Sequence, residues 1–327
     1  MLLPSGFPRD DAEFYAWFQD EGACRLFLAG VRWPDGFVCP VCGHRGGWLM
    51  ATGHYRCEGC RARTSVTAGT IFAGTRTPLS VWFQAAWKLA SSKGGVSAFE
   101  LHRTLGVSVQ TAWTMLHKYR RAMVRPNREP LLGRVQVDET YVGGPLPGRR
   151  GRGAIANKAI VAIAVEVRGN ACGRVRMRHL PHVAADTLVA FVTDTVASSW
   201  VDDRDGDPEA LLPTVVETDA LAVYRPLSTH GYTHVVINQT ESPDPAHVTM
   251  PHVHRVASLL KRWLLGTHQG GVQQRHLDAY LDEFVFRFNR RTSRDRGKLF
   301  YRLIELATQH EQTTYRQLVD GPNPQPA

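Results

Sequence analysis

Four of the six cysteines are paired by spacing. The segment "CPVC" supplies Cys39 and Cys42, and "CEGC" supplies Cys57 and Cys60, with 14 residues between the two pairs. Two such pairs joined by a short hairpin can present four thiolates tetrahedrally to Zn²⁺, although the gap is slightly shorter than is usual. A redox pair or four incidental buried thiols are the alternatives, and the duplication favours zinc. Four thiolates leave no open position, so we expect a structural metal.

Two aspartates lie in predicted strands, where a carboxylate needs a partner or a function. Asp138 lies inside "VQVDETYV", and Asp219 ends the short apolar segment "TVVETD". An unpaired acid inside a central strand is expensive. Carboxylates on neighbouring strands could hold divalent cations through oxygen, and two ions about 4 Å apart promote displacement at phosphorus. Either aspartate alone could be a cap or a surface ion pair. Glu139 alternates to the opposite face, so we expect a supporting role for it.

A basic segment near residue 260 contains two further candidate functional residues. "PHVHRVASLLKRWLLG" (251–266) contains no acid, and His254 and Lys261 lie seven residues apart. On a helix, that spacing puts both on one face, two turns apart. The alternative is an ordinary core helix.

The N-terminal half reads as helices around the cysteine hairpin. Residues 10–30 and 75–92 have helical spacing of apolar residues. Next, Ser97 caps a helix, Gly106 breaks it and Ser108 caps another, which predicts a helix-turn-helix. An ordinary helical hairpin is the alternative. We expect the second helix to present Gln110, Thr111 and Thr114 outward and to end in Lys118, Arg120 and Arg121.

The C-terminal half alternates strands and helices. Strands are predicted at 133–143, 158–169, 173–180, 214–219 and 233–238, and helices at 184–197, 251–266, 274–290 and 297–310. Three strands, a helix, a strand and then helices indicate an α/β protein with a mixed sheet, in the order of a ribonuclease-H-like fold. We therefore expect an α/β multidomain chain: helix and zinc ribbon at 1–75, helix-turn-helix at 76–130, catalytic domain at 131–310 and a tail at 311–327.

Composition suits a nucleic-acid partner and excludes a membrane protein. The 327 residues carry a formal net charge of +9, which favours polyanions. No apolar run reaches the length of a membrane span, and the N-terminus lacks the pattern of a signal peptide. We expect a cytoplasmic protein without stable disulfides, in which Cys24 and Cys172 are buried as small apolar residues.

Several motifs together resemble one family. The segments "VQVDETYVGG", "ETDALAVY" and "HLDAYLDEFVFRFNRR", together with the cysteine pairs, are similar to those of bacterial insertion-sequence DDE transposases with an N-terminal zinc ribbon and an ISXO2-like catalytic domain. The resemblance implies a ribonuclease-H-like domain that cuts and joins DNA with Mg²⁺ or Mn²⁺, and it matches the first two catalytic acids to Asp138 and Asp219.

The resemblance also places the third catalytic position. In relatives it precedes a lysine by seven residues, and counting back from Lys261 leads to His254, where relatives have Glu or Asn. Neutral imidazole can bind a metal but suits Mn²⁺ better than Mg²⁺. If His254 is only a helix residue, Glu241 or Asp244 is the nearest substitute. Lys261 would contact a phosphate near the cut.

Further DNA contacts are expected in basic segments. The loop "PLPGRRGRGAIANK" supplies Arg149, Arg150, Arg152 and Lys158 without an acid, and glycines there permit close approach to phosphates. Arg262 adjoins Lys261. The segment "FRFNRR" at 286–291 could face DNA or pack on the sheet.

The resemblance implies a transposase that binds the terminal inverted repeats of its element and target DNA, cleaves, and transfers strands, as a homo-oligomer on DNA. The rival hypothesis is a DNA-binding regulator or decayed copy without catalysis, which the histidine at the third position favours.

Overall fold

The computed structural model describes residues 6–125, 127–143, 158–201, 211–238 and 246–320. The chain forms two compact units. The first comprises 1–125 with 292–324, and the second comprises 126–291 with 325–327. In the described ranges, no helix is long and apolar enough to cross a membrane.

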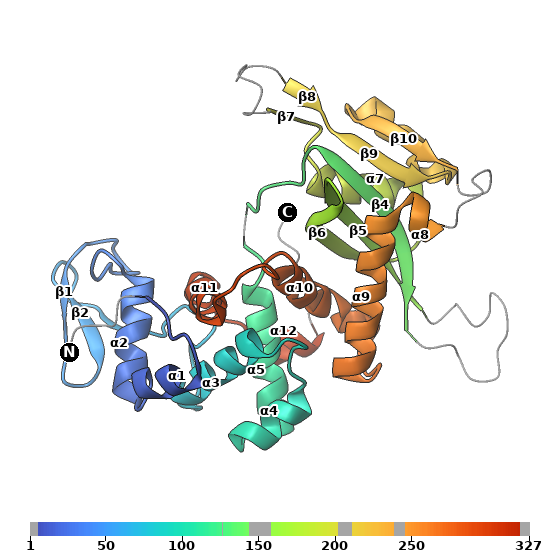
Figure 1. Cartoon of the computed structure of the whole chain (residues 1–327). Helices are drawn as coiled ribbons and strands as arrows, with labels where there is room; N and C mark the ends of the chain where they lie inside the picture. The colour runs from blue at the N-terminus through green and yellow to red at the C-terminus, as the bar shows by residue number, and fades with distance from the viewer. Residues whose placement is uncertain (1–5, 126, 144–157, 202–210, 239–245, 321–327) are drawn as a thin grey trace. The chain divides into compact units, whose positions relative to one another are not determined.

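The first unit opens with two short helices and the cysteine hairpin (Figure 1). Helices α1 (Asp11–Trp17) and α2 (Glu21–Arg32) are capped by the carboxylates of Asp10 and Asp20, which accept backbone N–H bonds of the first turn. An antiparallel sheet follows, made of β1 (Gly47–Leu49), β2 (His54–Cys57) and β3 (Arg63–Ser65) in that order. These strands form the predicted ribbon.

Five further helices complete this unit: α3 (Leu79–Ser91), α4 (Ala98–Leu105), α5 (Val109–Ala122), α11 (Arg296–Gln309) and α12 (Tyr315–Asp320). Helix α11 contacts α2, α3 and α5, and its Phe300 is fully buried against the rings of Phe14 and Phe83. The boundary expected at residue 310 therefore differs from the structure, because the apolar face of α11 is buried in the first unit and not on the sheet.

The predicted helix, turn and second helix are present in α4 and α5. Ser97 and Ser108 accept backbone N–H bonds from Glu100 and Thr111, and Gly106 ends α4 with a φ of 66°, a left-handed conformation that favours glycine. Helix α5 ends with basic residues as expected, with Arg120 and Arg121 in its last turn. Lys118 and Arg120 are buried, and Lys118 donates to the carbonyl of Ile71, since this end of α5 packs within the unit.

The second unit is built on a five-stranded mixed sheet with the order β10-β9-β4-β5-β6. The strands are β4 (Arg134–Val142), β5 (Ala159–Arg168), β6 (Ala171–Leu180), β9 (Val215–Asp219) and β10 (Thr233–Ile237). Strands β4, β5 and β6 are antiparallel neighbours, and β9 is parallel to both β4 and β10. This order and these directions are those of the expected ribonuclease-H-like α/β fold.

Helices cover both faces of this sheet (Figure 1). Helix α7 (Ala185–Thr195) and the 3-10 helix η1 (Ala222–His230) bury one face, and α9 (Pro251–His268) and α10 (Leu277–Phe288) bury the other. The remaining short elements are β7 (Ser199–Val201) paired with β8 (Leu211–Pro213), α8 (Ala246–Thr249) and η2 (Gln274–His276). The sheet thus has one core on each side.

Candidate active site and zinc site

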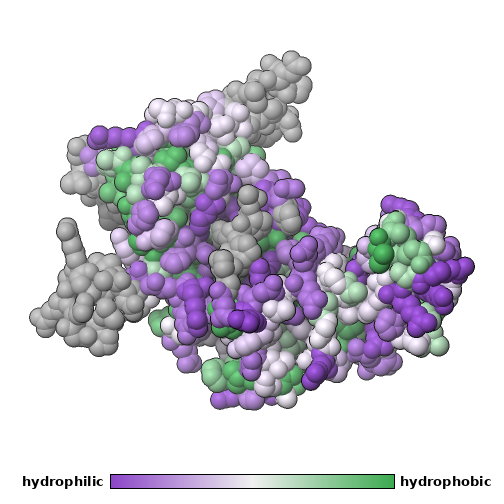
Figure 2. All heavy atoms as spheres, turned by 180° about the vertical axis from the view of Figure 1, so that it is seen from behind, coloured by the Kyte–Doolittle hydropathy of each residue, from purple (hydrophilic) through white to green (hydrophobic). Residues whose placement is uncertain are grey.

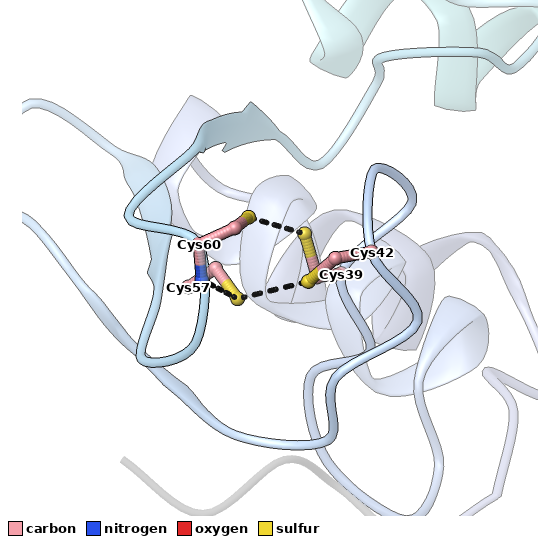
Figure 3. A group of neighbouring side chains, drawn as sticks. All are labelled: Cys39, Cys42, Cys57 and Cys60. Atoms are coloured by element: carbon pink, nitrogen blue, oxygen red, sulfur yellow. Dashed lines mark hydrogen bonds between the residues drawn. The ribbon is translucent and has the colours of Figure 1, made fainter.

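The four cysteines lie together at one end of the ribbon (Figure 3). Their ligand atoms all lie within 4.8 Å of one another. The Sγ atoms of Cys39 and Cys60 are 3.7 Å apart, as are those of Cys42 and Cys57. Four sulfurs each about 2.3 Å from a zinc ion would be separated by about 3.8 Å. The donor set and its spacing therefore fit zinc.

Local contacts favour the thiolate form of Cys39. Burial raises the pKa of its thiol, but the N–H groups of Cys42 and Val41 and hydrogen bonds with the Cys60 and Cys57 thiols lower that pKa to about 7. A backbone N–H group lowers the pKa of Cys60, but the neighbouring thiols raise it to about 12. A thiolate is the form that binds zinc. Of the other two cysteines, Cys24 is buried as expected, whereas Cys172 is only partly buried, with its Sγ 3.6 Å from Nδ1 of His252.

The sheet register brings the two aspartates together. Strands β4 and β9 run parallel, with Gln136 level with Glu217. Continued by two residues, the same register puts Asp138 level with Asp219. Laterally matched residues on neighbouring strands project to the same face and lie about 5 Å apart at Cα. The second carboxyl group is held by its own turn, because Oδ1 of Asp219 accepts the backbone N–H of Leu221 at 3.1 Å.

The Asp138 carboxyl group is strongly perturbed by this arrangement. Burial raises its pKa, the negative charges of Glu139 and Asp219 raise it further, and the result is about 7. The backbone N–H of Glu139 and the charge of Lys261 oppose the shift. Clustered acids that resist ionisation favour a divalent cation, which relieves their mutual repulsion.

Helix α9 places His254 next to this carboxyl group. Nδ1 of His254 lies 3.9 Å from Oδ2 of Asp138, and the two side chains are 28% and 17% exposed. Carboxylates and imidazole are suitable ligands for a divalent cation such as Mn²⁺. Among the described residues, however, only the four cysteines form a group with all ligand atoms within 4.8 Å of one another. The ligand atoms of Asp138, Asp219 and His254 are therefore spread more widely than those of the cysteines.

Lys261 shares the electrostatic environment of Asp138. The residue is exposed, yet partial burial of its ammonium group lowers its pKa, nearby Lys158 lowers it further, and Asp138 raises it. The two lysines and the aspartate therefore interact. Of the predicted DNA contacts, Arg262 is exposed, whereas Arg149, Arg150 and Arg152, like Glu241 and Asp244, lie outside the described residues.

A glutamine that sequence reasoning missed anchors the start of α9. Met250 at the N-cap makes no side-chain cap bond. Instead, Oε1 of Gln136 accepts the backbone N–H groups of His252 at 3.0 Å and Val253 at 3.2 Å, and Nε2 donates to Glu217 at 3.0 Å. Gln136 is 1% exposed. It thus caps α9 from the neighbouring strand, two residues before Asp138.

Two other polar residues support the site. Glu217 also pairs with Arg134, which leaves its carboxylate held from both sides. On the opposite face of β4, Tyr224 donates to Oε2 of Glu139 at 2.9 Å. Glu139 therefore takes the supporting position that strand alternation predicts. The available signal was the polar character of Gln136 between two valines, and of Glu217 after two valines, in predicted strands.

The remaining candidates divide between surface and packing. Gln110 is exposed, and Thr111 and Thr114 are half-buried. Thr114 donates to the carbonyl of Gln110 at 2.7 Å. In the segment 286–291, Asn289 both accepts from and donates to the backbone of Val175 on β6, which favours packing on the sheet over contact with DNA.

Comparison with known proteins gives matches over both units. Residues 130–289 match the family model of the ISXO2-like transposase domain, and residues 19–63 match that of the transposase zinc-ribbon domain. An uncharacterized protein in the transposable element ISH50 of Halobacterium salinarum is 29% identical over 296 residues, covering 83% of this chain and 91% of that protein. The crystal structure of a pre-cleavage Mos1 transpososome is 13% identical over 71% of this chain and 78% of that chain, with a TM-score of 0.23, which is too low to support an argument.

Proposed function

The chain belongs to the transposases that combine a zinc ribbon with an ISXO2-like domain, and on this premise we propose that it binds the ends of its insertion sequence and carries out metal-dependent DNA strand cleavage and strand transfer. The observation that carries this proposal is the 3.9 Å distance from Nδ1 of His254 to Oδ2 of Asp138, a carboxyl group whose pKa is raised by burial and in part by the charge of Asp219. In this proposal the protein acts on DNA in the cytoplasm.

The catalytic cations would be held by Asp138, Asp219 and His254. Mg²⁺ or Mn²⁺ bound there would supply charge to activate an attacking oxygen and to stabilise the leaving oxygen at the scissile phosphate. The open spacing of the three side chains leaves room for oxygens of the substrate. An imidazole in this set favours Mn²⁺ over Mg²⁺.

The other residues of the site would orient the substrate. Lys261, on the same face of α9 two turns beyond His254, extends positive charge toward the phosphate backbone next to the cut, and Lys158 adds to it. Gln136 and Glu217 keep the first turn of α9 at the sheet, so that His254 stays beside Asp138. Positioning and charge neutralisation supply most of the rate in such reactions.

End recognition is assigned to the first unit. The exposed Gln110 at the start of α5 is suited to read a base edge, with Thr111 and Thr114 as additional contacts. The basic loop 145–158 belongs to the second unit and would add contacts to phosphates there. Both ends of the element must be held at once for strand transfer, so we expect a homo-oligomer on DNA.

The test is cleavage of duplexes that carry the ends of the element. Asp138→Asn and Asp219→Asn should each reduce the cleavage rate by at least about a hundredfold, more than is usual for residues that only support a metal site, with unchanged end binding. The matched control is Asp194→Asn. It removes an exposed carboxylate from α7, on the opposite face of the sheet.

His254 has its own diagnostic. His254→Ala should slow cleavage, and His254→Glu should shift the metal preference from Mn²⁺ toward Mg²⁺. Because imidazole and carboxylate bind metal only in their deprotonated forms, and the pKa of Asp138 is raised to about 7, the parent should gain activity as pH rises toward 7. A parent protein that binds ends but cleaves neither strand with either metal would favour the non-catalytic regulator instead.

A further inference from the structure

One face of the zinc ribbon carries an indole and arginines in a single row. The register pairs Trp48 on β1 with Arg56 on β2, and Arg56 with Arg63 on β3. Paired residues of neighbouring strands project to the same side of a sheet. The three side chains therefore lie side by side across the ribbon. With strands spaced about 5 Å apart, the row is about 10 Å across.

The opposite face of the ribbon is its own core. Tyr55, the neighbour of Arg56 in sequence, projects to that side, and its ring lies 5.0 Å from the ring of Trp33 and 5.1 Å from that of Phe37. These rings pack with the buried cysteines Cys39 and Cys57. Since the ribbon needs only this side for its core, the row of Trp48 faces away from it.

The indole of Trp48 remains partly exposed. Trp48 is 42% exposed, and the guanidinium carbon of Arg61 lies 5.6 Å from its ring centroid, within range of a cation–π contact. Figure 2 shows many hydrophilic residues on the visible side of the ribbon. An exposed indole beside guanidinium groups is a typical feature of binding surfaces.

The charge on this face is not compensated. Residues 36–66 contain four arginines and a single acid, Glu58, which lies 4.0 Å from His44. In the part of the chain that the structure describes, no acid forms an ion pair with Arg56, Arg61 or Arg63. A partner with regularly spaced negative charges and flat apolar groups would complement both features, and a nucleic acid has both.

We propose that Trp48, Arg56, Arg61 and Arg63, here named the Trp48 face, form a docking surface for double-stranded DNA. The arginines contact phosphates, and the indole lies against a deoxyribose or a base edge. The identity of this DNA as the end of the element rests on the proposed function, but binding to a duplex backbone does not.

The experiment measures equilibrium binding of the full-length, zinc-loaded chain to labelled duplexes across a range of salt, without Mg²⁺ or Mn²⁺ so that no strand is cut. One duplex carries an end of the element and the other a random sequence. Arg61→Ala and Arg63→Ala should each weaken binding to both duplexes roughly tenfold and reduce the slope of log affinity against log salt by about 0.9. Trp48→Ala should weaken binding with an unchanged slope.

Arg9→Ala is the matched control, because it removes one exposed arginine of the same unit outside the ribbon, and it should bind as the parent does. A zinc content of one ion per chain verifies that the ribbon of each variant is folded. If Arg63→Ala loses zinc, Arg63→Gln takes its place. Binding of the Trp48-face variants equal to that of the parent on both duplexes would overturn the proposal. If the parent binds both duplexes through this face but never cleaves, only the proposed catalysis fails.

Discussion

Replacing Gln136 with leucine tests how the start of α9 is held against the sheet. Leucine has a similar volume but cannot accept the backbone N–H groups of His252 and Val253 or donate to Glu217. Because Met250 makes no side-chain cap bond, these first-turn N–H groups lose their acceptor. Glu217 keeps Arg134 as its partner.

The cost follows from the bonds removed. Two neutral hydrogen bonds contribute about 1 kcal/mol each, and the bond to a carboxylate contributes about 2 kcal/mol. Burying a leucine instead of an amide returns about 1–2 kcal/mol. We therefore expect a net loss of roughly 2–3 kcal/mol of stability in the second unit. About 2 kcal/mol of this belongs to the two N–H groups of α9, which corresponds to a roughly 30-fold change in a local opening equilibrium.

Hydrogen–deuterium exchange read by peptide gives the local measurement. Peptides from the first turns of α9 should exchange roughly 30-fold faster in Gln136→Leu, because opening of this segment becomes easier. Cleavage of element ends should slow at the same time, since His254 is no longer held beside Asp138, while binding of ends by the first unit should stay at the parent's level.

Val137→Ala is the control for general destabilisation. Val137 is buried on the opposite face of β4, and the truncation should cost about 2–3 kcal/mol without touching α9. If the leucine variant and this control speed exchange in α9 equally, or if the leucine variant exchanges as the parent does, the argument that Gln136 caps α9 is refuted.

Three more outcomes are expected. Without added Mg²⁺ or Mn²⁺, raising the pH from 4 to 7 should destabilise the parent relative to Asp138→Asn, because the folded-state pKa of about 7 lies above the unfolded value of about 4 and stability is lost as this group ionises. The difference in urea midpoints should correspond to at most about 4 kcal/mol, and a parent that gains stability relative to Asp138→Asn over this range would contradict the shift. Cys57→Ser should lose the zinc ion and disorder the ribbon while the second unit stays folded; metal analysis and peptide-resolved exchange measure this, and a parent without zinc would disprove it. Gln110→Ala should cost roughly 1–3 kcal/mol in binding the correct end and little on random DNA; an equal loss on both would make Gln110 a backbone contact or a folding residue.

Local chemistry in the sequence determined much of this protein. The spacing of the cysteine pairs predicts a zinc site because a two-residue gap lets two sulfurs reach one metal, and the structure brings all four together. Ser97, Gly106 and Ser108 marked the limits of α4 and α5, since capping depends on residues three or four positions away. Strand alternation assigned Asp138 and Glu139 to opposite faces, as the contacts of Glu139 with Tyr224 bear out.

The sequence did not show which distant segments pack against one another, and only the tertiary structure revealed this. The amphipathic pattern of α11 shows that one face is buried, but it does not say which core receives that face, and the helix packs in the first unit. The positive residues at the end of α5 illustrate the same limit, because Lys118 is buried against the carbonyl of Ile71 although its sequence context resembles that of a DNA contact.

The position of His254 depends on such a contact. Its distance along the chain from Lys261 could be read from the sequence, but its distance from Asp138 required α9 to dock on β4. That docking uses Gln136, which is 116 residues away from His252 and has no local feature that marks it as a helix cap. Helix caps are predictable when the acceptor lies within one turn, and here the chain's own N-cap residue, Met250, makes no side-chain cap bond. Gln136 on strand β4 supplies the acceptor instead. It lies two residues before Asp138, the residue that His254 faces.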